Sequence, residues 1–171
     1  MLTRSENKKR YLGFSLIEIL IVIAIIGILS AIIIPALNLV REKSKKTEVQ
    51  NVLRQLRTSV SLLEDDSAEW PGNRQPNVVD TVEGNEIWDL NDPNAEIIAT
   101  NGTFPNWAGP YMSIGSVKVD PWGNNYFFDP YYNLDPAGPG RWAVVIGSLG
   151  PNGVGQNVYD DDNMIEILAS E

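Results

Sequence analysis

The chain has 171 residues and a net charge of −9, enough for one modest domain beside an apolar segment. It has no cysteine and no histidine, which excludes disulfides, Cys/His zinc sites and His-based catalytic triads. Residues 1–63 carry ten Lys/Arg and four Asp/Glu (net +6), whereas residues 64–171 carry three and eighteen (net −15). So acidic a body repels phosphates, and we expect no nucleic-acid partner.

Residues 14–40 form a long apolar segment that contains one acidic residue, Glu18. About 20 helical residues cross the roughly 30 Å hydrocarbon layer of a membrane, where backbone groups are satisfied only within a helix. Lys8, Lys9 and Arg10 precede the segment, so the positive-inside rule predicts a cytoplasmic N-terminus. The sequence therefore predicts a single-pass helix with the body on the far side of the membrane and in contact with lipid.

Three interpretations of this segment compete. A secretory signal peptide has an apolar core of only about 7–15 residues. A plain anchor leaves Glu18 to be explained by a shallow position near the headgroups, because a mid-membrane carboxylate costs roughly 2.5–3.5 kcal/mol. In the third interpretation, cleavage between Gly13 and Phe14 creates an α-amino group that neutralises Glu18, in the same chain or in a neighbour.

The sequence GFSLIE at residues 13–18, the aliphatic run after it and Pro35 resemble the class III signal of the type IV pilin-like family. The resemblance implies that residues 1–13 are a leader and that a prepilin peptidase cuts after Gly13 and N-methylates Phe14. It also implies that Glu18 sets the register of a homopolymeric filament and that Pro35 is the family's helix proline. Pro35 is open to two interpretations, a tolerated kink or local melting on assembly.

The helical pattern resumes after Pro35 and runs to Leu63, so residues 41–63 are predicted to be an amphipathic second half of the helix. Apolar residues recur there at intervals of three and four: Val49, Val52, Leu53, Leu56, Val60 and Leu63. We expect this stripe to seat a small sheet. The basic residues at 41–46 are expected to form a solvated face near the headgroups.

Residues 64–110 are rich in Pro, Gly and Asn, which predicts a loop-rich insert with little regular structure. We expect Trp70, Trp88 and Trp107 to fix its loops onto the core. Residues 111–171 are expected to hold a three-stranded antiparallel sheet, with strands near 126–128, 142–146 and 164–168 and the middle one central. The predicted class is α+β, a long N-terminal helix packed on a small antiparallel sheet.

The last loop, residues 147–163, contains glycines, amides and the run Asp160–Asp162. Calcium favours six to eight oxygen ligands from carboxylates, amides and carbonyls, and this loop supplies all three. The spacing does not fit an EF-hand. On composition, a solvated acidic turn and a calcium site stay equally open.

Residues 106–163 further resemble the major pseudopilin of type II secretion systems, notably at DPWGNNY (120–126) and SLGPNG (148–153). That resemblance implies a calcium site formed by the Leu149 carbonyl, the Asn152 side chain and the carboxylates of Asp161 and Asp162, with Ser148, Tyr159 and Asp160 as possible additions. It implies a type IV pilin-like fold and a structural role in a secretion filament that starts at the bacterial inner membrane, with the C-terminal domain in the periplasm. The implied partners are copies of the chain, prepilin peptidase, minor pseudopilins and the inner-membrane assembly platform.

Two other functions are compatible with the sequence. A true pilus pilin, for adhesion, motility or DNA uptake, would share the N-terminal features, although many pilins carry two C-terminal cysteines that are absent here. A membrane-anchored extracytoplasmic enzyme would need a carboxylate pair, such as two of Asp160–Asp162 or Asp129 with Asp135. No such pair is flanked by an obvious pocket pattern, so we expect no enzymatic activity.

Overall fold

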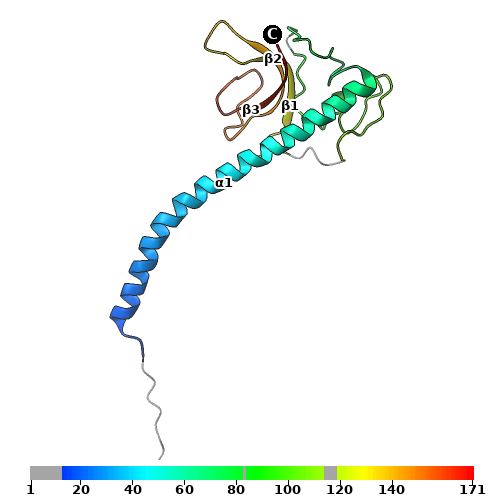
Figure 1. Ribbon diagram of the computed structural model, residues 1–171. Coiled ribbons are helices and arrows are strands. Elements are labelled where there is room, and N and C mark those ends of the chain that lie inside the picture. The colour runs from blue at the N-terminus through cyan, green and yellow to red at the C-terminus, as the bar shows by residue number, and fades with distance from the viewer. Residues whose placement is uncertain (1–12, 83, 114–118) are drawn as a thin grey trace, which may run out of the picture. The chain divides into compact units, whose positions relative to one another are not determined.

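The computed structural model describes residues 13–82, 84–113 and 119–171 (Figure 1). Its elements are the helix α1 (Leu16–Ser67), the 3₁₀-helix η1 (Pro93–Ala95) and the strands β1 (Tyr126–Asn133), β2 (Trp142–Ser148) and β3 (Met164–Ser170). The chain divides into two compact units between Lys43 and Ser44. The predicted α+β class is confirmed, while residues 1–12 of the predicted leader lie outside the described residues.

The helix α1 contains Pro35 and continues past the predicted end at Leu63 to Ser67. Its C-terminus is fixed locally, because the Ser67 hydroxyl donates to the Leu63 carbonyl at 2.7 Å and Ala68 turns into the left-handed region at φ 60°. A residue in that region ends a helix, since it directs the next peptide away from the helix axis. The hydrophobic stripe ends before the helix does.

In the first unit, every large apolar side chain from Phe14 to Val40 is exposed, from 46% at Leu37 to 84% at Phe14. Among the described residues, α1 alone is long and apolar enough to cross a membrane, and none of its most apolar stretch is buried. Soluble monomers rarely expose so large a continuous aliphatic surface, because its contact with water is unfavourable. This half of α1 therefore requires lipid or other chains around it.

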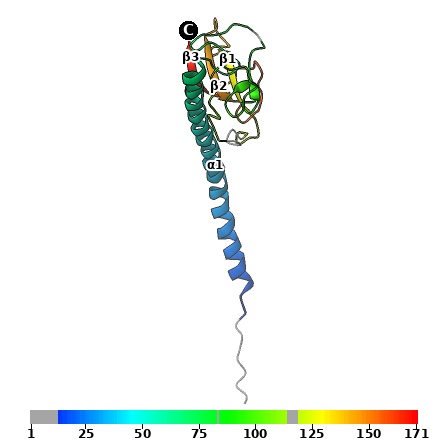
Figure 2. The same ribbon diagram turned by 90° about the vertical axis from the view of Figure 1, so that its right-hand side faces the viewer.

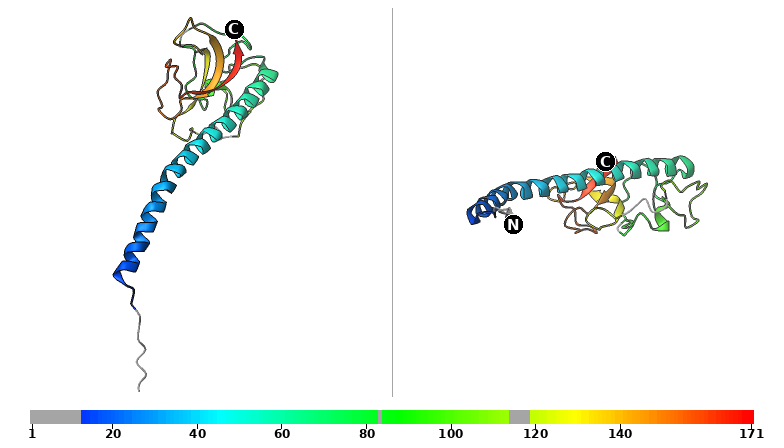
Figure 3. Two further views of the ribbon diagram at one scale, coloured as in Figure 1. Left: turned by 60° about the vertical axis from the view of Figure 1, so that its left-hand side comes forward. Right: turned by 90° about the horizontal axis from the view of Figure 1, so that it is seen from below.

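In the second unit, one face of α1 is buried at intervals of three and four residues. The buried apolar side chains are Val49, Leu53, Leu56, Val60 and Leu63, five of the six in the predicted stripe, and Val52 is partly buried. The strands and the loops lie on that face, all on one side of this half of the helix (Figures 2 and 3). The stripe is the seat of the sheet, and packing on it stabilises this half of α1.

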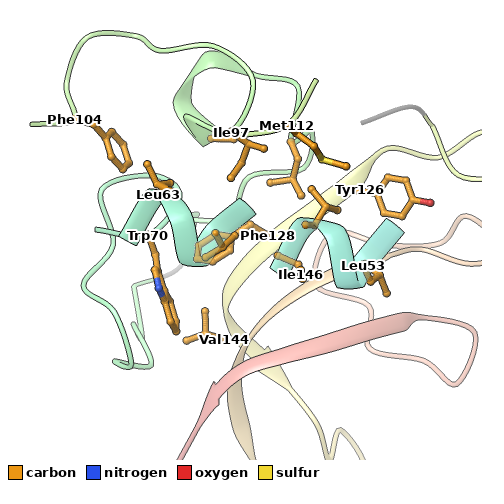
Figure 4. Close-up of a cluster of buried hydrophobic side chains, with 14 of the residues drawn as sticks. Leu53, Leu63, Trp70, Ile97, Phe104, Met112, Tyr126, Phe128, Val144 and Ile146 are labelled. Carbon is orange, nitrogen blue, oxygen red and sulfur yellow. The ribbon is translucent and has the colours of Figure 1, made fainter. Parts of the chain in front are cut away.

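The sheet is antiparallel with the order β1-β2-β3, so β2 is central, as its apolar sequence predicts. Alternate residues of the strands face opposite sides and build two clusters. Phe128, Val144 and Ile146 pack towards α1 in the larger cluster, together with insert residues such as Ile97 and Phe104 (Figure 4). Phe127, Ala143 and Val145 form a smaller cluster on the other face.

That second face is covered by loops rather than by a second layer. Trp88 of the insert packs on Phe127 with ring centroids 5.4 Å apart, and Leu149 and Tyr159 of the last loop pack on the same cluster. Gly147 lies opposite Phe127 in the sheet, and a Cβ there would come within 2.5 Å of the Phe127 ring. The Phe127 ring can therefore pack in this position only because residue 147 has no side chain.

The first residues of the predicted insert, 64–67, belong to α1, and among the other described residues up to 110 the only regular element is η1. The insert is nevertheless well anchored. It hydrogen-bonds along the outer edge of β1, with Ile87 and Phe128 exchanging two backbone bonds of 2.8 Å and the Leu90 N–H donating to the Tyr126 carbonyl at 3.0 Å. The expected role of the three tryptophans is confirmed, because Trp70 is buried and Trp88 and Trp107 pack against the clusters. The insert closes one edge of the sheet and protects it from pairing with other chains.

Candidate functional sites

The predicted processing site lies immediately before α1. Phe14 is 84% exposed, and among the described residues no atom lies within 4 Å of the position that a Gly13 side chain would occupy, its chain neighbours aside. Helix α1 begins two residues after Phe14, at Leu16. The peptide bond between Gly13 and Phe14 is therefore outside the helix and open to an enzyme.

Glu18 has a hydrogen-bond partner in its own chain. Its Oε2 accepts the backbone N–H of Ser15 at 2.7 Å, while the Ser15 carbonyl accepts the N–H of Glu18 at 3.1 Å. This carboxylate contact is one half of a capping box, and it puts a negative charge at the positive end of the helix dipole. The Ser-x-x-Glu spacing of residues 15–18 signals this arrangement, which our sequence analysis missed.

The basic residues that follow the apolar half are not uniformly solvated. Arg41, Lys43 and Lys46 are exposed, as expected. Lys45 is partly buried, and its Nζ lies 5.7 Å from the centre of the Trp122 ring, at cation–π range. The expectation of a fully solvated face is therefore wrong at Lys45.

The two arms of the last loop, 149–153 and 160–163, lie against each other. The Asn152 side-chain amide donates to Asp160 Oδ2 at 2.8 Å, and Asp160 Oδ1 accepts the N–H groups of Asp162 (3.1 Å) and Asn163 (3.2 Å). Gly150, at φ 65°, packs so closely on Asp162 that a Cβ there would collide with the Asp162 carbonyl oxygen. Asn152 and Asp160 are thus the predicted side chains that the fold brings together.

The remaining predicted ligands are less concentrated. The buried Ser148 hydroxyl donates to Asp120 Oδ2 at 2.6 Å, and the Tyr159 hydroxyl donates to Asn157 Oδ1 at 3.2 Å. Asp161 is exposed and Asp162 is half-buried. Across the part of the chain that the structure describes, no three His, Cys, Asp or Glu side chains are gathered as a metal-binding group. A cation at this loop would therefore need the Leu149 carbonyl and the Asn152 amide oxygen, which are ligand types that calcium accepts.

Asp129, one of the carboxylates considered for catalysis, is poorly placed for it. Asp129 is completely buried in β1, where Oδ1 accepts the N–H of Tyr131 at 2.7 Å and Oδ2 is buried without a hydrogen bond. Burial raises the pKa of the Asp129 carboxyl to about 6, and the nearby Glu86 charge adds to the rise. Since no solvent reaches Asp129, a substrate cannot reach it either.

Sequence analysis also missed the role of the turn that precedes β1. Asp120 is buried and accepts hydrogen bonds from the N–H groups of Trp122 and Asn124 and from the Ser148 hydroxyl. An Asp that opens a Pro-x-Gly-Asn turn is a readable signal for the first two bonds. The third bond, to a residue 28 positions away, requires the folded chain.

The model of the prokaryotic N-terminal methylation motif matches residues 8–34. The type II secretion system core protein G of Klebsiella pneumoniae is 32% identical over 91% of this chain and 95% of its own length. The protein of the same name from Escherichia coli K12 is 28% identical over 88% of this chain and 87% of its own length. The fimbrial protein EcpC of Eikenella corrodens is 36% identical, but over only 62% of this chain and 66% of its own. No solved structure is significantly similar to the chain.

These similarities coincide with the geometry. The methylation motif includes the exposed Gly13–Phe14 peptide bond and most of the exposed apolar half of α1. Together these features indicate a single-pass anchor in the inner membrane. The similarity to the secretion proteins continues through the sheet and the last loop, whereas the fimbrial protein matches a shorter part. This chain therefore belongs to the family of type II secretion system core protein G, the major pseudopilins.

Proposed function

We propose that the chain is the repeating structural subunit of a filament that a type II secretion system builds from the inner membrane. The observation that carries this proposal is that, among the described residues, every large apolar side chain in the first half of α1 is exposed. Lipid surrounds it before assembly, and equivalent helices of other copies surround it afterwards. When each copy contacts the next one through a different surface from the one that contacts the previous copy, the contacts are head-to-tail and can generate an open filament.

Processing is the first step of the proposed assembly. Prepilin peptidase cuts between Gly13 and Phe14 and methylates the new N-terminus, which the exposed position of this bond favours. Mass spectrometry of the purified subunit should find a chain that begins at N-methyl-Phe14. A Gly13→Ala variant should accumulate as precursor, and a normal mature mass from that variant would contradict the assignment.

Glu18 is proposed to set the register between copies. A new α-amino group on Phe14 would lie next to Ser15, whose N–H already binds the Glu18 carboxylate. Pairing with a neighbour's amine would reward one axial position of helix against helix. A Glu18→Ala subunit should be cleaved but not assembled, and filaments of normal yield seen by electron microscopy would remove this role. We further propose that Pro35 allows α1 to melt locally during assembly.

We propose that the N-terminus is cytoplasmic and the C-terminal domain periplasmic, with the finished filament in the periplasm or at the cell surface. The absence of native cysteine allows a direct test. A cysteine introduced at exposed Asp65 should react with a membrane-impermeant maleimide in intact spheroplasts. One introduced at Ser5 of the Gly13→Ala precursor, which keeps the leader, should react only after lysis. The opposite pattern would reverse the orientation.

Secretion and pilus functions differ in what their loss abolishes. We propose secretion, with minor pseudopilins and the assembly platform as further partners, because the similarity to core protein G extends over the body. A deletion strain should fail to release folded exported proteins and keep its surface pili. The match to a fimbrial protein favours the alternative, in which the strain loses pili and secretes normally. Neither function involves catalysis by this chain.

We also propose that the last loop binds calcium through Leu149, Asn152, Asp161 and Asp162, with Asp160 close to Asn152. The ion would neutralise the acidic run and clamp the two arms, a stabilisation of about 2.7 kcal/mol at a hundredfold excess over Kd. Calcium should raise the melting temperature of the full chain in detergent by several degrees. Asn152→Asp should strengthen the effect and Asn152→Ala should weaken it, whereas identical melts with calcium and with chelator would refute the site.

A further inference from the structure

A buried hydrogen-bond network joins the turn before β1 to the base of the last loop. Its centre is Asp120, which is 3% exposed, and its partner in the loop is Ser148, which is fully buried. The Ser148 hydroxyl donates to Asp120 Oδ2 at 2.6 Å. Hydrogen bonds to a charged acceptor inside a protein are among the stronger ones, so this link is a firm one.

On the turn side, Asp120 holds its own segment in shape. Oδ1 accepts the N–H groups of Trp122 (2.9 Å) and Asn124 (2.8 Å), and the Asn124 amide donates to Oδ2 at 3.3 Å. Such side-chain bonds to backbone two and four residues ahead define a tight turn. The same turn carries Trp122, whose ring lies beside Lys45 of α1.

On the loop side, two further bonds fix Gly150. Its N–H donates to Ser148 Oγ at 3.1 Å, and its carbonyl accepts the Asn124 amide at 2.9 Å. Gly150 in turn packs on the Asp162 carbonyl, so the position of one loop arm determines that of the other. Each donor and acceptor in this chain of contacts has few alternatives, because Asp120 and Ser148 are both buried.

We propose that Asp120 is the positioning residue of the last loop. The fixed turn orients Ser148 and Asn124, and these hold Gly150 so that the two arms meet before any ion binds. Because Trp122 belongs to the same turn, the network also connects the loop to α1 at Lys45. The part of this inference that concerns calcium affinity rests on the calcium site proposed above, whereas the positioning of the loop does not.

Two substitutions break the link from opposite sides. Ser148→Ala removes the hydroxyl that both donates to Asp120 and accepts from Gly150. Asp120→Asn leaves one acceptor oxygen for two sets of donors, so it cannot accept hydrogen bonds from both the turn N–H groups and the Ser148 hydroxyl. Asp92→Asn is a matched control, because Asp92 makes the same kind of turn bond to the Asn94 N–H, at 2.8 Å, in the insert.

Hydrogen exchange of the full chain in detergent without calcium tests the proposal. Amides of residues 150–163 should exchange about tenfold faster or more in both variants. The buried half of α1 should keep its protection, and Asp92→Asn should leave the loop unchanged. The effect of the double variant should be smaller than the sum of the two single effects, because both single variants remove the Asp120–Ser148 hydrogen bond.

Unchanged loop exchange in Asp120→Asn, or effects of the two variants that simply add, would overturn the proposal. A second experiment measures calcium affinity, which should fall about tenfold or more in Asp120→Asn, because the residues that hold the loop in place are no longer fixed. If the unmodified chain binds no calcium, the calcium site fails, and the exchange result alone still decides the role of Asp120.

Discussion

The two halves of α1 share one helix and differ in what surrounds them. Between Phe14 and Val40 every large apolar side chain is exposed, whereas from Val49 to Leu63 a stripe of five is buried under the sheet. Both halves contain several Leu and Val residues, whereas Ile occurs only in the first. A helix is stabilised mainly by the packing of its apolar face, so the first half depends on its environment and the second on its own chain.

A leucine in each half of α1 gives the clearest test of this difference. Leu56 is fully buried and Leu20 is 54% exposed. Leu56→Ala should lower the free energy of unfolding of the body by about 2–5 kcal/mol, through lost burial and a cavity. Leu20→Ala should leave it unchanged. Urea denaturation in detergent, followed by tryptophan near-UV circular dichroism, measures both, and equal losses would show that the two halves do not differ in this way.

Each of the two compact units also contains a carboxylate that accepts a hydrogen bond from one nearby backbone N–H. Glu18 in the first unit accepts from Ser15, and Asp129 in the second accepts from Tyr131. Burial raises the pKa of Asp129 from 3.8 to about 6, so its ionised form is disfavoured in the folded state. The contribution of Asp129 to stability should be greatest below about pH 4 and should fall by about 2–3 kcal/mol as pH rises to 7. Asp129→Asn should remove this fall.

Melting curves between about pH 4 and pH 7 measure this pH dependence. Glu18→Gln and Asp135→Asn are controls, and both should keep the fall. A pH profile that Asp129→Asn leaves intact would mean that another group is responsible.

Replacing glycine with alanine should have opposite effects on stability at Gly147 and at Gly27. A side chain at Gly147 would meet the Phe127 ring at 2.5 Å. At Gly27, no atom of the described residues lies within 4 Å of the equivalent position, apart from the neighbouring helix backbone. Gly147→Ala should therefore destabilise the body by about 1–3 kcal/mol through overpacking. Gly27→Ala should increase the helicity of the first half, by about 0.5–1 kcal/mol of propensity. Thermal melts and far-UV circular dichroism distinguish the two.

The smallest effect is expected at the surface of the second half. Arg57 pairs with Glu166 of β3 at 2.6 Å and also donates to the Ile167 carbonyl, but its side chain is 52% exposed. Arg57→Ala should cost less than about 1 kcal/mol in urea denaturation, since exposed pairs gain little in water. Arg54→Ala, on the same helix, is the control, and a loss above roughly 2 kcal/mol at Arg57 would indicate a larger structural role.

Sequence alone determined the strongly periodic and strongly apolar elements. The apolar half of α1, the stripe from Val49 to Leu63, and the central position of β2 all follow from spacing and composition, because burial demands those patterns. The GFSLIE motif at residues 13–18, the aliphatic run after it and Pro35 together indicated the type IV pilin-like family. The Ser15–Glu18 contact was equally readable from its spacing, which shows that local interactions lie within reach of sequence reasoning.

Only the tertiary structure decided the contacts between distant segments. No periodic pattern predicts that Asp120 binds Ser148, that Lys45 lies beside Trp122, or that Trp88 covers Phe127. The last loop shows the same limit, since its composition supplied calcium ligands but the fold brought Asn152 to Asp160 and turned the Ser148 hydroxyl to Asp120. Such contacts depend on how the whole core packs, and packing is a property of three dimensions that local sequence does not encode.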